Sequence, residues 1–243
     1  MARYAIYLEI GKDGLCMAHV PELPGCFVRA ETRRAALRRL PAAVQDHHAW
    51  LRSYGEPALP EDEQVDLHVA GESPDIGPFD PEDAAALFPG DREPLTREGL
   101  EGYLRLMAYS RRDLLRLVWD LPEYLLDWQL DSQSFTIRRL LRHIGNAEEW
   151  YVSRLVPPET LPAQWKDDEE LLVFDFLEME RATAVDRLRQ MSEEERSEIS
   201  YPSRWTSHPE EAWTLRKALR RFLEHEREHT AQIREILDAR RQW

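Results

Sequence analysis

Two histidines near the end of the chain have a spacing that suits metal coordination. His225 and His229 lie four residues apart in the stretch FLEHEREHTAQIREIL. On a helix this spacing places both side chains on one face, one above the other. Phe222, Ile233 and Ile236 continue that face at intervals of three and four, so both histidines are predicted to point into an apolar core. A buried imidazole is costly unless it is hydrogen-bonded or coordinated, and a neutral imidazole is a good ligand for a divalent metal.

A third histidine, in the stretch RRLLRHIGNAEEW, has the spacing of a residue at the edge of a helical core. His143 follows Leu140 by three residues and precedes Ala147 by four, which predicts that its side chain lies at the inner edge of a helix. Catalytic metal sites typically use three protein ligands and leave one position for water or substrate. We therefore expect His143, His225 and His229 to hold one divalent metal. The alternative is that each is a hydrogen-bonded core residue.

The letters HEREH also fit the H-E-x-x-H pattern of zinc metalloproteases, in which Glu226 would be the general base. Such proteases need a third ligand farther along the chain, and only 14 residues follow His229. The longer form of the pattern places a glycine and a histidine where this chain has Gln232 and Glu235. Helix geometry also rotates Glu226 by about 100° from His225, onto a face predicted to meet solvent. The match to a protease is therefore interpreted as coincidental.

No general base can be assigned from the sequence. Glu148 and Glu149 lie close to His143 along the chain, but the pattern does not direct either of them toward the predicted metal. The catalytic residues other than the metal ligands stay unassigned.

The elements that must position these histidines are four long helices in the second part of the chain. Apolar residues recur with a period near 3.6 over residues 96–119, 134–155, 167–191 and 209–240. An amphipathic helix cannot bury its apolar stripe alone, so four of them predict an all-α four-helix bundle over residues 96–243. Facing helices of such a bundle can bring side chains from different helices to one internal site.

The first 72 residues follow a different pattern. Alternating apolar residues predict strands in RYAIYLEI, LCMAHVPEL, GCFVRAE and QVDLHVAG. Between the third and fourth strands, a helix is predicted to start after Thr32, to be kinked or interrupted at Pro41 and to stop at Gly55. The order β-β-β-α-β predicts an α+β domain over residues 1–72, and a linker rich in proline and acidic residues follows over residues 73–95.

The composition is that of a globular protein, with 42% hydrophobic and 32% charged residues. No apolar run approaches the roughly 20 residues that a membrane span needs, and the N-terminus lacks the pattern of a signal peptide. A cytoplasmic location without membrane attachment is therefore expected. The net charge of −14 argues against nucleic-acid binding, because phosphate backbones attract cationic proteins. Cys16 and Cys26 are expected to be small buried side chains.

The helical region resembles the DinB family of metalloenzymes. The histidine midway along the second predicted helix, the pair in HEREHTAQI on the last helix and Gln232 three residues after His229 all match that family's arrangement. The resemblance covers roughly residues 95–240. It implies a site in which His143, His225 and His229 bind a divalent metal, either zinc or nickel, with iron and manganese as further options. It also implies a small-molecule substrate, because some relatives are transferases and isomerases that use low-molecular-weight thiols.

The first 72 residues resemble the HicB antitoxin family, in the stretch YAIYLEIGKDGLCMAHVPELPGCFVRAETRRAAL. HicB proteins bind and silence an mRNA-cleaving toxin, so the resemblance implies a protein partner for this domain. The DNA-binding tail that is usual in that family is replaced here by the helical region.

Two functions are compatible with these patterns. The first, which we favour, is a metal-dependent enzyme, either a hydrolase or a thiol-dependent transferase. The second is a non-catalytic, partner-binding or antitoxin-like regulatory protein in which the bundle is a scaffold. The long apolar stripes of the helices also allow a homodimer.

Overall fold

The computed structural model describes residues 1–61, 63–76, 84–129, 131, 134–166, 170–202 and 204–241. The chain divides into two compact units, one made of Met1–Glu93 with Ser203–Ala212 and the other of Pro94–Pro202 with Trp213–Trp243. The first unit therefore includes a short piece of the connection that precedes the last helix. The domain limits given above from the sequence stay predictions.

The first unit has the predicted order β-β-β-α-β, which confirms the α+β class. Its strands are β1 (Ala2–Ile10), β2 (Cys16–His19), β3 (Phe27–Ala30) and β4 (Val65–Pro74), and its helix is α1 (Arg33–Ser53). The sheet order is β3-β2-β1-β4, with antiparallel neighbours except for the parallel pair β1 and β4. A parallel neighbour needs a crossover connection, which α1 supplies.

Helix α1 begins and ends as its sequence predicts but does not break in the middle. Thr32 is the N-cap, and its hydroxyl accepts a hydrogen bond from the Ala35 N–H. Gly55 has a φ of 76°, a conformation that favours glycine, and follows the helix as a C-terminal stop. Of the two effects predicted for Pro41, an interruption is wrong, because α1 is continuous through it, and a kink stays a prediction. Pro41 is exposed, whereas Leu40 and Val44 on either side of it are buried in the core of this unit, which stabilises the helix on both sides of the proline.

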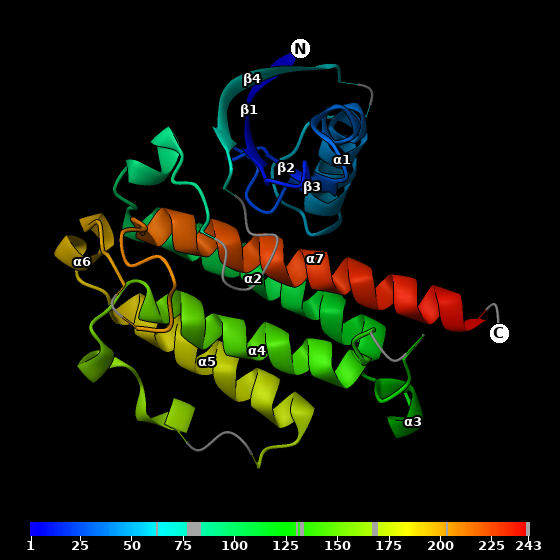
Figure 1. The fold of residues 1–243 in the computed structure, drawn as a ribbon, viewed down its shortest axis with the longest axis vertical. Helices are drawn as coiled ribbons and strands as arrows, with labels where there is room; N and C mark the ends of the chain where they lie inside the picture. The colour runs from blue at the N-terminus through cyan, green and yellow to red at the C-terminus, as the bar shows by residue number, and fades with distance from the viewer. Residues whose placement is uncertain are drawn as a thin grey trace. The chain divides into compact units, whose positions relative to one another are not determined.

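The second unit is a four-helix bundle, as predicted. Its long helices are α2 (Arg97–Val118), α4 (Ile137–Ser153), α5 (Val173–Gln190) and α7 (Leu215–Arg241). Helix α7 packs against α2 and α4, and α4 packs against α5 (Figure 1). The shorter helices are α3 (Glu123–Leu126), α6 (Glu193–Ser197) and the 3-10 turns η1 (Pro89–Arg92), η2 (Pro158–Thr160) and η3 (Ala163–Lys166), of which η1 precedes the bundle.

Helix α7 begins six residues later than predicted, at Leu215. The main chain of Trp213 pairs with that of Ser200 through two hydrogen bonds of 2.9 and 2.8 Å. This bridge uses backbone groups that a helix would need for its own ladder. The Thr214 hydroxyl then accepts a hydrogen bond from the Lys217 N–H at the first turn. Helix α5 likewise begins at Val173, and residues 167–169 of the predicted helix lie outside the described residues.

The interior of the bundle consists of two separate apolar clusters. One contains Leu104, Met107 and Leu219, and the other contains Leu114, Ile144 and Ile233. Because Met107 and Leu114 lie on the same face of α2, the two clusters are neighbours along the bundle, and the partly buried Met179 packs against both. Within the described residues, no helix is long and apolar enough to cross a lipid bilayer.

Candidate metal centre

Three histidine side chains from two helices meet at one side of the bundle. His143 comes from α4, and His225 and His229 come from α7. The Nε2 atom of His225 lies 3.0 Å from that of His143 and 3.2 Å from that of His229. The ring centroids are 4.4 to 4.8 Å apart. All three side chains are half-buried, so the cluster is reached from solvent and is not sealed in the core.

The donor set suits a divalent transition metal. Each ring offers one nitrogen as a ligand atom, and these atoms all lie within 4.8 Å of one another. Nitrogen ligands on a tetrahedral ion, with bonds near 2.1 Å, stand roughly 3.4 Å apart. The observed Nε2 distances of 3.0 and 3.2 Å are close to that spacing. Three imidazoles would leave a fourth position for water or substrate, as catalytic sites do.

Gln232 sets the orientation of one of the three rings. The Nδ1 atom of His229 lies 2.9 Å from Gln232 Oε1. An amide oxygen only accepts hydrogen bonds, so we assign the proton of neutral His229 to Nδ1. Its Nε2 lone pair then faces the other two rings. Metal-bound histidines commonly have such a partner on the second ring nitrogen, which fixes the tautomer.

The environment keeps at least two of the rings neutral. Burial is the largest cause that lowers the pKa of His143, to about 4, and nearby His229 and Arg139 lower it further while Glu228 opposes them. Burial also lowers the pKa of His225 far below its usual value of 6.5, with smaller contributions from His229 and His143. Neutral imidazole is the form that binds metal, so these rings need not lose a proton at neutral pH.

An aromatic wall borders the cluster. Tyr151 packs edge-on to His225 with ring centroids 5.9 Å apart, and it also lies 5.1 Å from the ring of Phe222. Tyr151 is buried, and burial is the largest cause that raises the pKa of its hydroxyl. This apolar side limits access of water to the site from the bundle interior.

Near the histidines, four charged side chains from the four long helices form one hydrogen-bonded network. We call Arg111 of α2, Glu148 of α4, Arg181 of α5 and Glu226 of α7 the charged layer. Arg111 Nε donates to Glu226 at 2.5 Å, and Arg111 also donates to Glu148. Arg181 donates to both Glu148 oxygens at 2.8 and 2.9 Å and to Glu226 at 3.2 Å. Each long helix therefore contributes one charge to a network that joins all four.

The sequence prediction that Glu226 lies on a solvated face is wrong. Glu226 is only 2% exposed, because α7 is enclosed at this level and both carboxylate oxygens are held by arginines. Burial acts to raise its pKa, but Arg111 and Arg181 outweigh burial and lower it. Glu148 is also 2% exposed and held in the same way. Neither carboxylate is placed as a general base for the histidine cluster.

The charged layer was missed because charged residues are expected on helix surfaces. The signal was nevertheless present in the spacing. Arg111 follows Met107 by four residues and precedes Leu114 by three. Glu226 follows Phe222 by four residues. Opposite charges at core spacing on several helices indicate a buried network, because an isolated buried charge is too costly to occur.

Known proteins are similar in sequence to both parts of the chain. The family model described as the DinB superfamily matches residues 106–233, which is more than half of the chain and includes all three histidines. The N-terminal part is 29% identical over 69 residues to the UPF0150 protein Ta0767 of Thermoplasma acidophilum, a match that covers 28% of this chain and 99% of that protein.

Among solved structures, the chain is similar to YfiT from Bacillus subtilis, described as a probable metal-dependent hydrolase with an unusual four-helix bundle topology. The identity is 19% and the TM-score is 0.45, with 62% of this chain and 92% of the other covered.

Proposed function

The chain belongs to the DinB superfamily, and on that premise we propose that it is a metal-dependent enzyme whose divalent metal is held by His143, His225 and His229. The observation that supports this most directly is the convergence of three Nε2 atoms at one half-buried point. Zinc or nickel suits three imidazoles best, and iron and manganese also accept such ligands. A bound divalent metal supplies Lewis acidity, which polarises an oxygen or lowers the pKa of a water or thiol.

The residues of the chain have distinct roles in this proposal. The three histidines bind the metal in their neutral form, and Gln232 fixes the ring of His229 by accepting its Nδ1–H. The aromatic wall of Tyr151 and Phe222 lowers the local dielectric constant and so strengthens electrostatic interactions at the site. The charged layer anchors α7 against the other helices at the level of the histidines, because Glu226 is the neighbour of His225.

The decisive experiment measures metal content in protein made without a polyhistidine tag. We expect about one divalent ion per chain after growth in metal-replete medium. A His225→Ala variant should lose most of it, because two imidazoles bind far more weakly than three. His208→Ala is the matched control, since His208 is a surface histidine paired with Glu210. Absence of metal from both the unaltered protein and the His225→Ala variant would refute the proposal.

The reaction class needs a separate assay. Hydrolysis of an activated aryl ester, measured with and without a chelator, tests the hypothesis that the protein is a hydrolase. Transfer of a group from an electrophilic substrate to glutathione, as a representative low-molecular-weight thiol, tests the hypothesis that the protein is a thiol-dependent transferase. Metal-dependent turnover in one assay assigns the class. Stoichiometric metal without turnover in either would leave the metal site intact and refute these two reaction classes for the substrates used.

The N-terminal domain supports a second proposal, in which it binds a protein partner as an antitoxin-like module. The similar stretch is 69 residues long and covers 99% of the relative's own length, which supports a role for this domain that does not depend on the bundle. We expect a partner captured by the unaltered chain to be captured equally by the His225→Ala variant. Capture that depends on the histidines would instead place recognition at the metal centre.

A further inference from the structure

The bundle has one open side, between α2 and α5. Helix α2 packs against α7, α7 against α4 and α4 against α5, whereas α2 and α5 make few direct contacts. Two arginines span the space between them. Arg111 Nη1 donates to the Leu177 carbonyl of α5 at 2.7 Å, and Arg181 Nη1 donates to the Met107 carbonyl of α2 at 2.8 Å. Each arginine thus donates a hydrogen bond to the opposite helix. The accepting residue lies four positions before the arginine of that helix.

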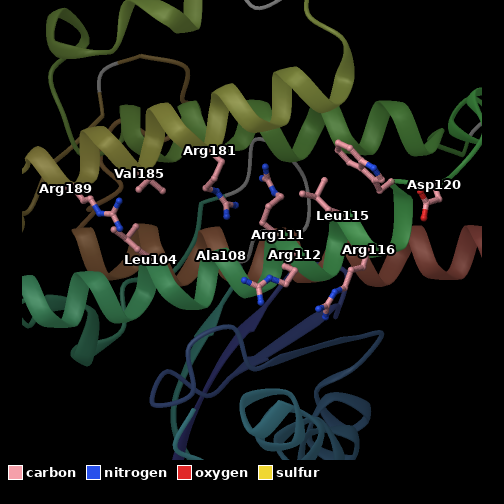
Figure 2. Close-up of a pocket in the computed structure, with 11 residues that line it drawn as sticks. Leu104, Ala108, Arg111, Arg112, Leu115, Arg116, Asp120, Arg181, Val185 and Arg189 are labelled. Carbon is pink, nitrogen blue, oxygen red and sulfur yellow. The ribbon is translucent and has the colours of Figure 1, made fainter. Parts of the chain in front are cut away.

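A groove with a volume of about 770 Å³ lies along this open side. It has the size of a small-molecule site. Figure 2 shows Arg111 and Arg181 pointing toward one another in its middle, with Arg189 and Asp120 at opposite ends. From Leu104 to Arg116 the groove follows α2 for about 18 Å, given the rise of a helix.

The lining combines apolar walls with several guanidinium groups. Five of the eleven lining side chains are arginines and one is an aspartate. The apolar walls include Leu104, Ala108 and Val185. Four of these arginines already face carboxylates: Arg111 and Arg181 pair with Glu148 and Glu226, Arg189 with Glu101, and Arg116 with Asp113.

The arginines keep binding capacity despite their present partners. The exposed pairs Arg189–Glu101 and Arg116–Asp113 contribute little and exchange readily with another anion. At the floor, Arg111 uses one N–H on each of its two terminal nitrogens in the bonds described, and a guanidinium carries two on each. A second N–H on each nitrogen can therefore point to a ligand.

Stability alone does not account for this arrangement. Taking charged groups out of water is expensive, and apolar side chains of similar volume are often as stable or more so. Apolar side chains at these positions would close the open side. The charged layer instead bridges α2 and α5 and presents guanidinium groups in a groove with apolar walls.

We propose that the α2–α5 groove binds a small amphipathic carboxylate. Its carboxylate group pairs with the guanidinium groups of Arg111, Arg181 and Arg112 in the middle of the groove, and its apolar body lies along Leu104, Ala108 and Val185. Asp120 disfavours an anion at the far end, which sets the direction of the ligand. This site is distinct from the histidine cluster and does not depend on a metal.

Calorimetric titration with octanoate tests the proposal on the full chain. Octan-1-ol is the uncharged analogue, and acetate is the analogue without an apolar body. Chelator-treated protein is used, since carboxylates also bind metals. We expect one octanoate per chain, bound at least tenfold more tightly than either analogue. Equal affinity for octanoate and octan-1-ol would overturn the proposal, because the arginines would then play no part.

Three variants locate the site. Ala108→Trp fills the groove from an exposed position on α2 and should abolish octanoate binding. Ala182→Trp, at an exposed position on α5 that does not line the groove, is its matched control and should bind normally. Arg112→Gln, also at an exposed position, should weaken binding about tenfold, as expected for a lost charge-assisted hydrogen bond.

The outcomes separate this site from the metal centre. His225→Ala should bind octanoate as the unaltered chain does. Loss of octanoate binding in that variant, or equal loss in Ala108→Trp and Ala182→Trp, would overturn the proposal. Unchanged octanoate binding in both Ala108→Trp and Arg112→Gln would also overturn the proposal. Thermal unfolding of each variant verifies that it is folded.

Discussion

Gln232 is the residue through which the metal proposal can be tested without touching a ligand. Its side-chain oxygen accepts the Nδ1–H of His229, which presents Nε2 to the site. In a Gln232→Ala variant we expect metal affinity to fall by about 10- to 100-fold, as is typical when such a partner is removed. Competition with a chromophoric chelator measures this. Gln190→Ala, at an exposed position at the end of α5, is the control, and equal affinity in all three proteins would contradict the role of Gln232.

His143 should make the metal-free protein less stable in mild acid. Its pKa falls from 6.5 to about 4 on folding, chiefly through burial. Between these values the unfolded chain binds a proton that the folded chain does not, so stability present above pH 6.5 is lost as the pH falls toward 4. We expect urea unfolding at several pH values to show a shallower decline for His143→Ala. An unchanged decline in that variant would contradict the assignment, and His208→Ala should leave it unaltered.

At the scale of helices, the charged layer connects all four long helices of the bundle. Glu226→Gln removes one of the two buried carboxylates that pair with Arg111 and Arg181. The free energy of unfolding should therefore fall by about 3 kcal/mol. Adding Arg111→Met to Glu226→Gln removes one charge of each sign. We therefore expect the double variant to be less destabilised than the sum of the single variants.

Urea unfolding measures these differences, and Glu235→Gln on the exposed side of α7 is the control, with a change within about 0.5 kcal/mol. The same Glu226→Gln protein should keep its metal affinity. Loss of metal-dependent catalysis without loss of stability would instead support Glu226 as a base and revive the protease interpretation.

Helices α4 and α5 approach closely at Gly145. A Cβ added there would overlap the ring of Phe176, whereas one added at Gly102 of α2 would meet no atom within 4 Å. Gly145→Ala should lose about 1–3 kcal/mol by overpacking. Gly102→Ala should gain roughly 0.5–1 kcal/mol, because alanine favours the helix. Thermal unfolding of the two variants should therefore shift in opposite directions, and a stabilised Gly145→Ala would contradict the packing.

At the scale of the whole molecule, the N-terminal unit should fold without the bundle. Its sheet and α1 enclose an apolar core of their own, which includes Ile6, Leu8 and Leu40. We expect a fragment of residues 1–93 to unfold cooperatively on heating, although it loses the hydrogen bond from the Ala85 N–H to Glu211. Leu40→Ala should destabilise the fragment by about 2–5 kcal/mol. A fragment without a cooperative transition would show that residues 204–212 are needed.

The sequence alone predicted the order of the strands and long helices and three histidines that the structure brings together. Period-two and period-3.6 patterns predicted the order β-β-β-α-β and four long helices, because local periodicity reflects which face of an element is buried. The same periodicity selected His143, His225 and His229. It erred where non-local contacts outweigh local preference: α1 continues through Pro41, and the bridge from Trp213 to Ser200 delays the start of α7.

Tertiary structure decided what lies between the elements. Helical spacing did not place Glu148 or Glu226 in the core, and only the packing of four helices at one level buries them and pairs their charges with Arg111 and Arg181. The groove between α2 and α5 is likewise a property of how the helices meet, since no single helix encodes a space beside itself. Distances between side chains on different helices depend on contacts between residues far apart in the sequence. The periodicity of one helix therefore does not predict them.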